Sequence, residues 1–222
     1  MISRRNLFTG LGIAPLVAAV SRGAGSSDAA PQEHKRRFAE LSGREMLRQR
    51  YFPNIELTTS EGRKVRFYDD LLKDKIVVIN LMYADCDGIC PVTTANLKRV
   101  RTLLREQIAR DVFIYSLTLR PEQDTPAALK AYAEMQGVHD PHWLFLTGKP
   151  DEVDLLRHKI GFADPDPDVD RDKSRHSGML RYGNEATSVW GTCQGSAEPE
   201  WIAQEIGFAI PREFKKKPAV NE

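Results

Sequence analysis

The chain has 222 residues, of which 41% are hydrophobic and 28% charged, and its formal net charge is +1. This length is enough for one domain with a sizeable core, and the near-neutral charge excludes the basic excess that is typical of nucleic-acid-binding proteins. The three cysteines are an odd count, which leaves one thiol over if the other two form a pair.

The first 30 residues resemble an export signal. Arg4 and Arg5 form a twin-arginine pair, and the apolar stretch at 7–20 is shorter than the roughly 20 residues that a membrane-spanning helix needs. We therefore expect residues 1–30 to direct export by the twin-arginine route to the bacterial periplasm. An uncleaved signal would instead tether the protein to the inner membrane. Residues 31–52 are expected to be a polar lead-in segment with a short helix.

From residue 53 the hydrophobic pattern alternates between strands and helices. We expect strands at 54–59, 64–67, 76–83, 112–117 and 143–146, and helices at 69–72, 91–108, 126–136 and 150–161. A hairpin at 178–192, with its turn at 183–185, and a helix at 199–208 would close the domain. This order predicts an α/β domain over 53–210 with a thioredoxin-like mixed sheet flanked by helices. The segment 211–222 is expected to be a flexible tail, and the acidic run at 164–172 a solvated loop.

Two thiols, Cys86 and Cys90, follow the apolar strand at 76–83 directly. A dithiol with this spacing can be oxidised as a pair or can bind a soft metal such as Cu(I). We expect Cys90 to lie at a helix N-terminus, where the helix dipole favours a thiolate. Asp85 and Asp87 would raise the pKa of Cys86 and favour a bound cation. An inert disulfide is the third interpretation, but the loop that it would close is too short to restrict the unfolded chain much.

Four motifs in order carry a resemblance to a known family. The cysteine motif is followed by Asp124-Thr125-Pro126, by Leu146-Thr147-Gly148 and by His176-Ser177 at the start of the predicted hairpin. Over about residues 53–206 the chain resembles the Sco/SenC family of thioredoxin-like copper proteins, which act in cytochrome c oxidase assembly. The resemblance implies that copper, as Cu(I) or Cu(II), is bound by Cys86, Cys90 and His176.

The surroundings of His176 fit a metal ligand in one respect and depart from the family in another. Arg171, Lys173 and Arg175 precede it, and these cations would keep its imidazole neutral, which is the form that binds a metal. Members of the family commonly carry an acidic residue directly before this histidine, where the chain has Arg175.

Cys193 is the largest departure from the family pattern. We expect it after the last strand, on the side of the sheet where the hairpin begins. There it could be an additional sulfur ligand, or a resolving thiol that pairs with Cys86 or Cys90. The alternative is a half-buried free cysteine beside Trp190.

Three functions remain open on this pattern. The first is a metallochaperone, not an enzyme with turnover, that delivers copper to a respiratory oxidase copper centre or maintains its thiols. Its partners, by resemblance, would be the copper-centre subunit of cytochrome c oxidase or another cuproprotein, and other copper chaperones. The second is a periplasmic thiol-disulfide oxidoreductase that uses Cys86 and Cys90, and the third is a copper or redox sensor.

Overall fold

A computed structural model describes residues 42–108, 111–173 and 178–215, and its seven strands form one mixed sheet in the order β2-β1-β5-β4-β3-β6-β7. The strands are β1 (Glu56–Thr59), β2 (Lys64–Arg66), β3 (Ile76–Met82), β4 (Val112–Thr118), β5 (Trp143–Gly148), β6 (Met179–Asn184) and β7 (Val189–Gln194). The helices are α2 (Gly43–Tyr51), α3 (Ile89–Gln107), α4 (Pro126–Met135), α5 (Pro150–Lys159), α6 (Pro167–Arg171) and α7 (Pro199–Phe208), with a π-helix η1 (Phe67–Leu72) and a 3-10 helix η3 (Arg212–Phe214).

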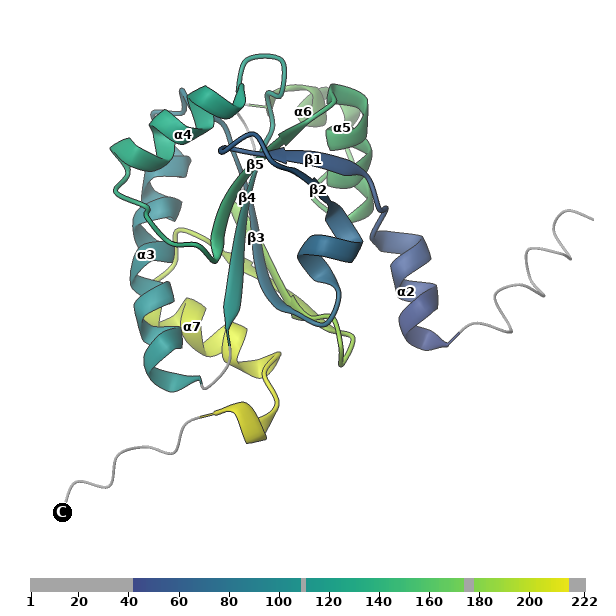
Figure 1. The fold of residues 1–222 in the computed structure, drawn as a ribbon, viewed down its shortest axis with the longest axis vertical. Coiled ribbons are helices and arrows are strands. Elements are labelled where there is room, and N and C mark those ends of the chain that lie inside the picture. The colour runs from purple at the N-terminus through teal and green to yellow at the C-terminus, as the bar shows by residue number, and fades with distance from the viewer. Residues whose placement is uncertain (1–41, 109–110, 174–177, 216–222) are drawn as a thin grey trace, which may run out of the picture. The chain divides into compact units, whose positions relative to one another are not determined.

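The centre of the sheet is parallel and its edges are antiparallel. β3 pairs with β4 and β4 with β5 in parallel, whereas β6 runs antiparallel to β3. Figure 1 shows α3, α4 and α7 on one side of the sheet and α5 and α6 on the other. All seven residues of β3 are buried, as expected of a strand that is covered on both faces. The predicted α/β architecture, a mixed sheet flanked by helices, is confirmed.

The closing hairpin differs from its prediction. β6 and β7 pair along their whole lengths, so the turn lies at 185–188 and not at 183–185. Gly183 is required inside the strand, because a Cβ at this position would lie 2.3 Å from the ring of Trp190 opposite. The longer pairing also places Cys193 inside β7, whereas the sequence predicted that it would follow the last strand.

Several other boundaries are corrected. α3 begins at Ile89, two residues before the predicted start, and a short helix, α6, interrupts the acidic run that we expected to be a loop. The predicted flexible tail is ordered as far as Lys215, which forms a β-bridge with Ile108. The predicted export signal, 1–30, and the lead-in segment as far as residue 41 lie outside the described residues. Within the described ranges, no helix is both long and apolar enough to span a membrane.

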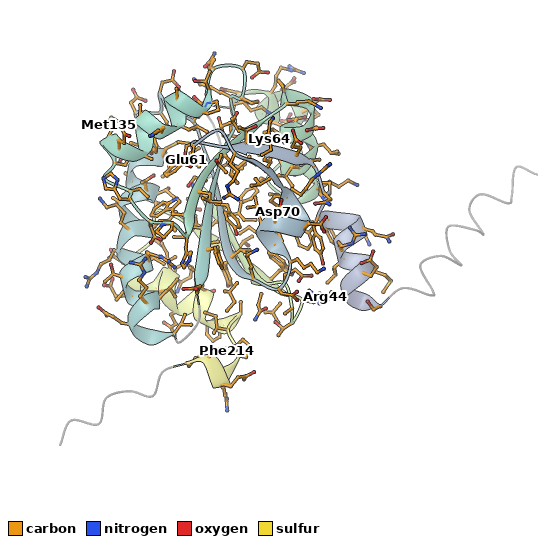
Figure 2. The ribbon with its side chains drawn as sticks, viewed as in Figure 1. Arg44, Glu61, Lys64, Asp70, Met135 and Phe214 are labelled. Atoms are coloured by element: carbon orange, nitrogen blue, oxygen red, sulfur yellow. The ribbon has the colours of Figure 1, made fainter. Side chains whose placement is uncertain are left out.

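A buried carboxylate holds the hairpin turn to the N-terminal part of the domain. The Glu185 side chain is 4% exposed and accepts hydrogen bonds from Arg44 Nε (2.8 Å), from Tyr68 Oη (2.7 Å) and from the Asp74 backbone N–H (2.9 Å). Arg44 belongs to α2 and is labelled at the foot of that helix in Figure 2. The burial of Glu185 opposes ionisation, but the hydrogen bonds from Arg44, Asp74 and Tyr68 outweigh it and lower the pKa of the carboxyl. One side chain therefore connects α2, η1 and the β6–β7 turn.

We predict that Glu185→Gln lowers the free energy of unfolding by about 1–3 kcal/mol at pH 7, because three donors lose a charged acceptor. The loss of unfolding free energy should lie near the lower end of this range, because the Arg44 side chain is 38% exposed and water screens its charge. A carboxylate with a lowered pKa stabilises the fold above its unfolded pKa, about 4.3, and this contribution is lost as the pH falls through the folded pKa. The deficit of the variant should therefore shrink in acid.

Urea unfolding at a series of pH values measures this difference. Glu134→Gln, an exposed position on α4, serves as the control and should leave the stability unchanged. An equal deficit at neutral pH and in acid would contradict the assignment of Glu185 as an ionised anchor.

Candidate metal centre

Two of the predicted site residues, Cys86 and Cys90, lie where β3 ends and α3 begins. Residues 83–88, which we call the cysteine loop, connect β3 to α3 and carry Cys86. Cys90 lies in the first turn of α3. Both are free thiols and both are buried, with 7% and 1% of their surface exposed. The placement of a dithiol between a buried strand and a helix N-terminus is thus confirmed.

Asp124 fixes the start of the cysteine loop. Its carboxylate accepts the Ala84 backbone N–H at 3.1 and 3.3 Å and the Thr118 hydroxyl at the end of β4. Thr125, the next residue, caps α4 by accepting the Ala128 N–H at 3.2 Å. The burial of Asp124 raises the pKa of its carboxyl, and the two donated hydrogen bonds oppose that shift. The loop before Cys86 is therefore attached to the neighbouring strand by a carboxylate that is almost completely buried.

Tyr83 covers the sulfur of Cys86. The tyrosine hydroxyl donates a hydrogen bond to Cys86, and burial, followed by this interaction, raises the pKa of Tyr83 to about 12. Arg120 lies over the Tyr83 ring, with Cζ 3.8 Å from the ring centroid, and its guanidinium also binds Asp85 at 3.1 Å. This cation–π contact and ion pair hold Tyr83 in place beside the thiol.

The two thiols of the pair differ in acidity. Burial acts to raise the pKa of Cys86, but hydrogen bonds from the Cys90 thiol and from the backbone N–H groups of Cys90 and Gly88 outweigh it and lower that pKa. Burial raises the pKa of Cys90 to about 12, and its hydrogen bond to Cys86 adds to the shift. Cys86 is thus the thiol that ionises first, and Cys90 is the donor that stabilises its thiolate.

This order of acidity reverses the sequence prediction. We expected the helix dipole to favour a thiolate at Cys90 and the flanking aspartates to oppose one at Cys86. The dipole effect on Cys90 is overcome by its burial. The Asp85 carboxylate is 70% exposed and forms an ion pair with Arg120. Water and the guanidinium therefore weaken the effect of its charge on the Cys86 thiol.

Cys193 is not brought together with the pair. It is buried in β7 opposite Leu180, and burial, followed by the charge of Glu205 in α7, raises the pKa of its thiol to about 12. Within residues 42–108, 111–173 and 178–215, no group of three or more His, Cys, Asp or Glu side chains is arranged to hold a metal ion. A metal held by Cys86 and Cys90 would therefore need a further ligand from outside the described residues.

His176, the predicted third ligand, lies outside the described residues. The described chain resumes at Gly178, where a Cβ would lie 2.8 Å from the Ile89 side chain, one residue before Cys90. Gly178 has a φ of 63° and accepts the Gly195 N–H at 2.9 Å. Gly178, two residues after His176, therefore lies next to the first turn of α3 at the start of the hairpin.

Comparison with known proteins identifies the family. The SCO1/SenC family profile matches residues 44–210, about three quarters of the chain. The chain belongs to the SCO1/SenC family. The SCO1 protein homolog of Bacillus subtilis is 32% identical over 88 residues, which are 40% of this chain and 44% of that relative. The alignment with this relative therefore spans less than half of its length.

Solved structures agree with the architecture. Bradyrhizobium japonicum ScoI, solved with copper bound, is 24% identical with a TM-score of 0.54, and covers 70% of this chain and 96% of its own. BsSco, a Sco family cytochrome c oxidase assembly protein with an identified disulfide switch, is 24% identical with a TM-score of 0.57, covering 70% and 90%. At this identity the likeness establishes the fold, which is thioredoxin-like as predicted.

Two residues of the site were missed from sequence. Tyr83 is the last residue of an apolar run and carries no signal that distinguishes it from its neighbours. Asp124 belongs to one of the four family motifs, but the sequence analysis did not identify it as a site residue. The signal that could have identified it is an acidic residue directly before Thr-Pro, close after a buried strand, where its carboxylate can reach the neighbouring loop.

We predict that Cys86 reacts with iodoacetamide at least about tenfold faster than Cys90 or Cys193 at pH 7, because the thiolate is the nucleophile and only Cys86 has a lowered pKa. Peptide mapping by mass spectrometry after short reaction times measures the three rates. Cys90→Ala should slow the reaction at Cys86, since it removes the thiol that donates to the Cys86 sulfur. Equal rates at the three thiols would contradict the assignment.

Proposed function

We propose that this family member binds copper through Cys86, Cys90 and His176. The observation that carries the proposal is the pair of free thiols hydrogen-bonded to each other at the end of β3. Two thiolates and one imidazole are ligands that suit copper, and thiolates favour Cu(I). The copper-bound structure of Bradyrhizobium japonicum ScoI, which shares the fold, supports this choice of metal.

The chemistry of the pair fits a metal that is held and then passed on. Both sulfurs must be deprotonated to bind a metal, and Cys86 is prepared for this by four hydrogen-bond donors in the loop and the helix. In copper binding, Cys90 gives up its proton when the metal takes its place. In this proposal copper is cargo, which an acceptor with its own thiols can remove by ligand exchange.

The proposed acceptor is the copper-centre subunit of cytochrome c oxidase or another cuproprotein, and the proposed donors are other copper chaperones. The SCO1/SenC family and the description of BsSco as a cytochrome c oxidase assembly protein support this role. The protein would then act as a metallochaperone in the assembly of a respiratory oxidase.

We predict that the reduced full chain retains Cu(I) in a stoichiometric amount after gel filtration. Cys86→Ser and Cys90→Ser should each abolish retention, because a single thiolate remains, and His176→Ala should weaken binding at least about tenfold. Competition with a chromophoric Cu(I) chelator measures the affinities.

Cys193→Ser is the matched control, because it also removes one buried thiol but lies apart from the pair. An unchanged affinity is expected for this variant. A wild-type protein that retains no copper would end the metal proposal, and a loss on Cys193→Ser would show that β7 contributes a ligand.

Maintenance of the thiols of the oxidase copper centre is a second candidate function, favoured by the unequal acidity of the pair. A Cys86 thiolate can attack a substrate disulfide and form a mixed disulfide, releasing one substrate thiolate. Cys90 would then attack the Cys86 sulfur, so that the second substrate thiol leaves and the pair is oxidised. The disulfide switch identified in BsSco supports the capacity of this fold for such exchange.

We predict that Cys90→Ser traps the mixed disulfide at Cys86 when a disulfide-bonded peptide is added, because the resolving thiol is absent. Non-reducing electrophoresis and mass spectrometry detect the adduct. Cys193→Ser should resolve it as the wild type does, since Cys193 is separate from the pair. The absence of any adduct in Cys90→Ser would exclude the exchange function and leave the copper proposal untouched.

The proposed location rests on the N-terminal sequence. We propose that the protein is exported to the periplasm by the twin-arginine route. In the alternative, the signal is not cleaved and tethers the protein to the inner membrane. Arg4 and Arg5 support it. Cell fractionation tests it: replacing both arginines by lysine should retain the chain in the cytoplasm, and unchanged export would refute the route.

A further inference from the structure

A small apolar pocket lies away from the cysteine pair, between α2, the end of α5 and the β6–β7 hairpin. Its volume is about 170 Å³ and its lining is almost entirely apolar apart from two cations, with the residues Leu47, Tyr51, Phe52, Lys159, Ile160, Gly161, Arg181 and Trp190. Phe52 and Trp190 form an aromatic wall, with ring centroids 4.5 Å apart. Leu47 and Tyr51 belong to α2, which Figure 1 shows as a separate helix beside the sheet.

Arg181 is the unusual member of this lining. Its Nε is buried without a hydrogen-bond partner, and no ion pair is formed by its guanidinium in the described part of the chain. Burial lowers the pKa of Arg181, and no carboxylate among the described residues opposes the shift, yet a guanidinium keeps its charge in proteins.

Gly161 makes room for this guanidinium. A Cβ at Gly161 would lie 2.5 Å from Arg181 Nη2. The φ of Gly161 is 79°, in the left-handed region that residues with a side chain rarely adopt. The ring of Phe162 lies 5.9 Å from Arg181 Cζ. The backbone thus leaves room for the guanidinium at the pocket, where its buried Nε has no hydrogen-bond partner among the described residues.

The charges around the pocket favour an anion. Lys159 is a second cation in the lining, and the ring of Tyr51, another lining residue, has Arg50 Cζ 5.3 Å from its centroid. Among the described residues, no carboxylate lines this pocket. On its other side Arg181 borders a larger cavity of about 300 Å³, which Asp164, Asp170 and Asp172 also line. Asp170 is bound there by Arg157 and by the Asp164 N–H.

The size of the pocket limits the ligand. An apolar cavity of about 150 Å³ is large enough to bind benzene. We propose that this pocket binds a small organic carboxylate whose apolar body has about the size of one aromatic ring. Arg181 holds the carboxylate through its two-pronged donor geometry, and the Phe52–Trp190 wall and Leu47 hold the ring.

Benzoate is the probe for this proposal. Titration of the full chain should quench or shift the fluorescence of Trp190 with saturation in the low millimolar range, about what one ring and one carboxylate supply. The Arg181 Nε–Hε cross-peak in an ¹H–¹⁵N spectrum should move along the same binding curve. Benzamide, which has the same shape without the charge, should bind at least about tenfold more weakly.

Substitutions locate the site. Arg181→Met should weaken benzoate binding at least about tenfold, whereas Arg63→Met, an exposed control in the β1–β2 turn, should change nothing. If Arg181→Met does not fold, Leu47→Trp fills the apolar half from α2 and should weaken binding in its place. Trp190→Phe should remove the fluorescence change while the cross-peak of Arg181 still moves.

Three results would overturn the proposal. They are equal binding of benzamide and benzoate, an Arg181 cross-peak that does not move at about 20 mM benzoate, and inorganic phosphate that binds as well as benzoate. The last result would identify an anion site in which the apolar walls take no part. Copper retention by the cysteine pair is independent of all three.

Discussion

The buried carboxylate of Asp124 is the constraint on which the geometry of the site depends. It receives the Ala84 N–H and the Thr118 hydroxyl, and so it joins the first residues after β3 to the end of β4. Because the parallel pairing of β3 and β4 is fixed by seven register positions, this joint sets where the cysteine loop leaves the sheet. The backbone pairing of β3 and β4 therefore fixes the position of Cys86. A flexible loop would leave that position undefined.

The unequal acidity of the two thiols has the same structural origin. α3 begins at Ile89, so its first turn directs backbone N–H groups toward the loop, where those of Gly88 and Cys90 reach the Cys86 sulfur. The same helix buries Cys90 and leaves its thiol with Cys86 as acceptor. One helix start thus stabilises a thiolate on the preceding loop and keeps a proton on its own cysteine.

Sequence predicted those parts of the molecule that depend on local pattern. The apolar run at 76–83 identified β3, and the position of Cys86 and Cys90 after it was correct. The order of acidity was wrong, because it depends on the burial of Cys90 and on which donors reach Cys86. The hairpin turn was wrong for a similar reason: Glu185 is held there by Arg44 and Tyr68, which are more than 100 residues away in the chain. Such contacts have no periodicity that a single sequence reveals.

The two proposed functions, copper binding and disulfide exchange, would use the same two sulfurs, so one molecule could not perform both at once. A disulfide between Cys86 and Cys90 removes both thiolate ligands, and a bound metal occupies the lone pairs that exchange requires. Cys193, buried in β7 beside Tyr182 and Glu205, offers no third thiol that would separate the two reactions. The state of the pair therefore decides which reaction is open, and the reductant that keeps Cys86 and Cys90 as thiols is as necessary to a copper carrier as the metal itself.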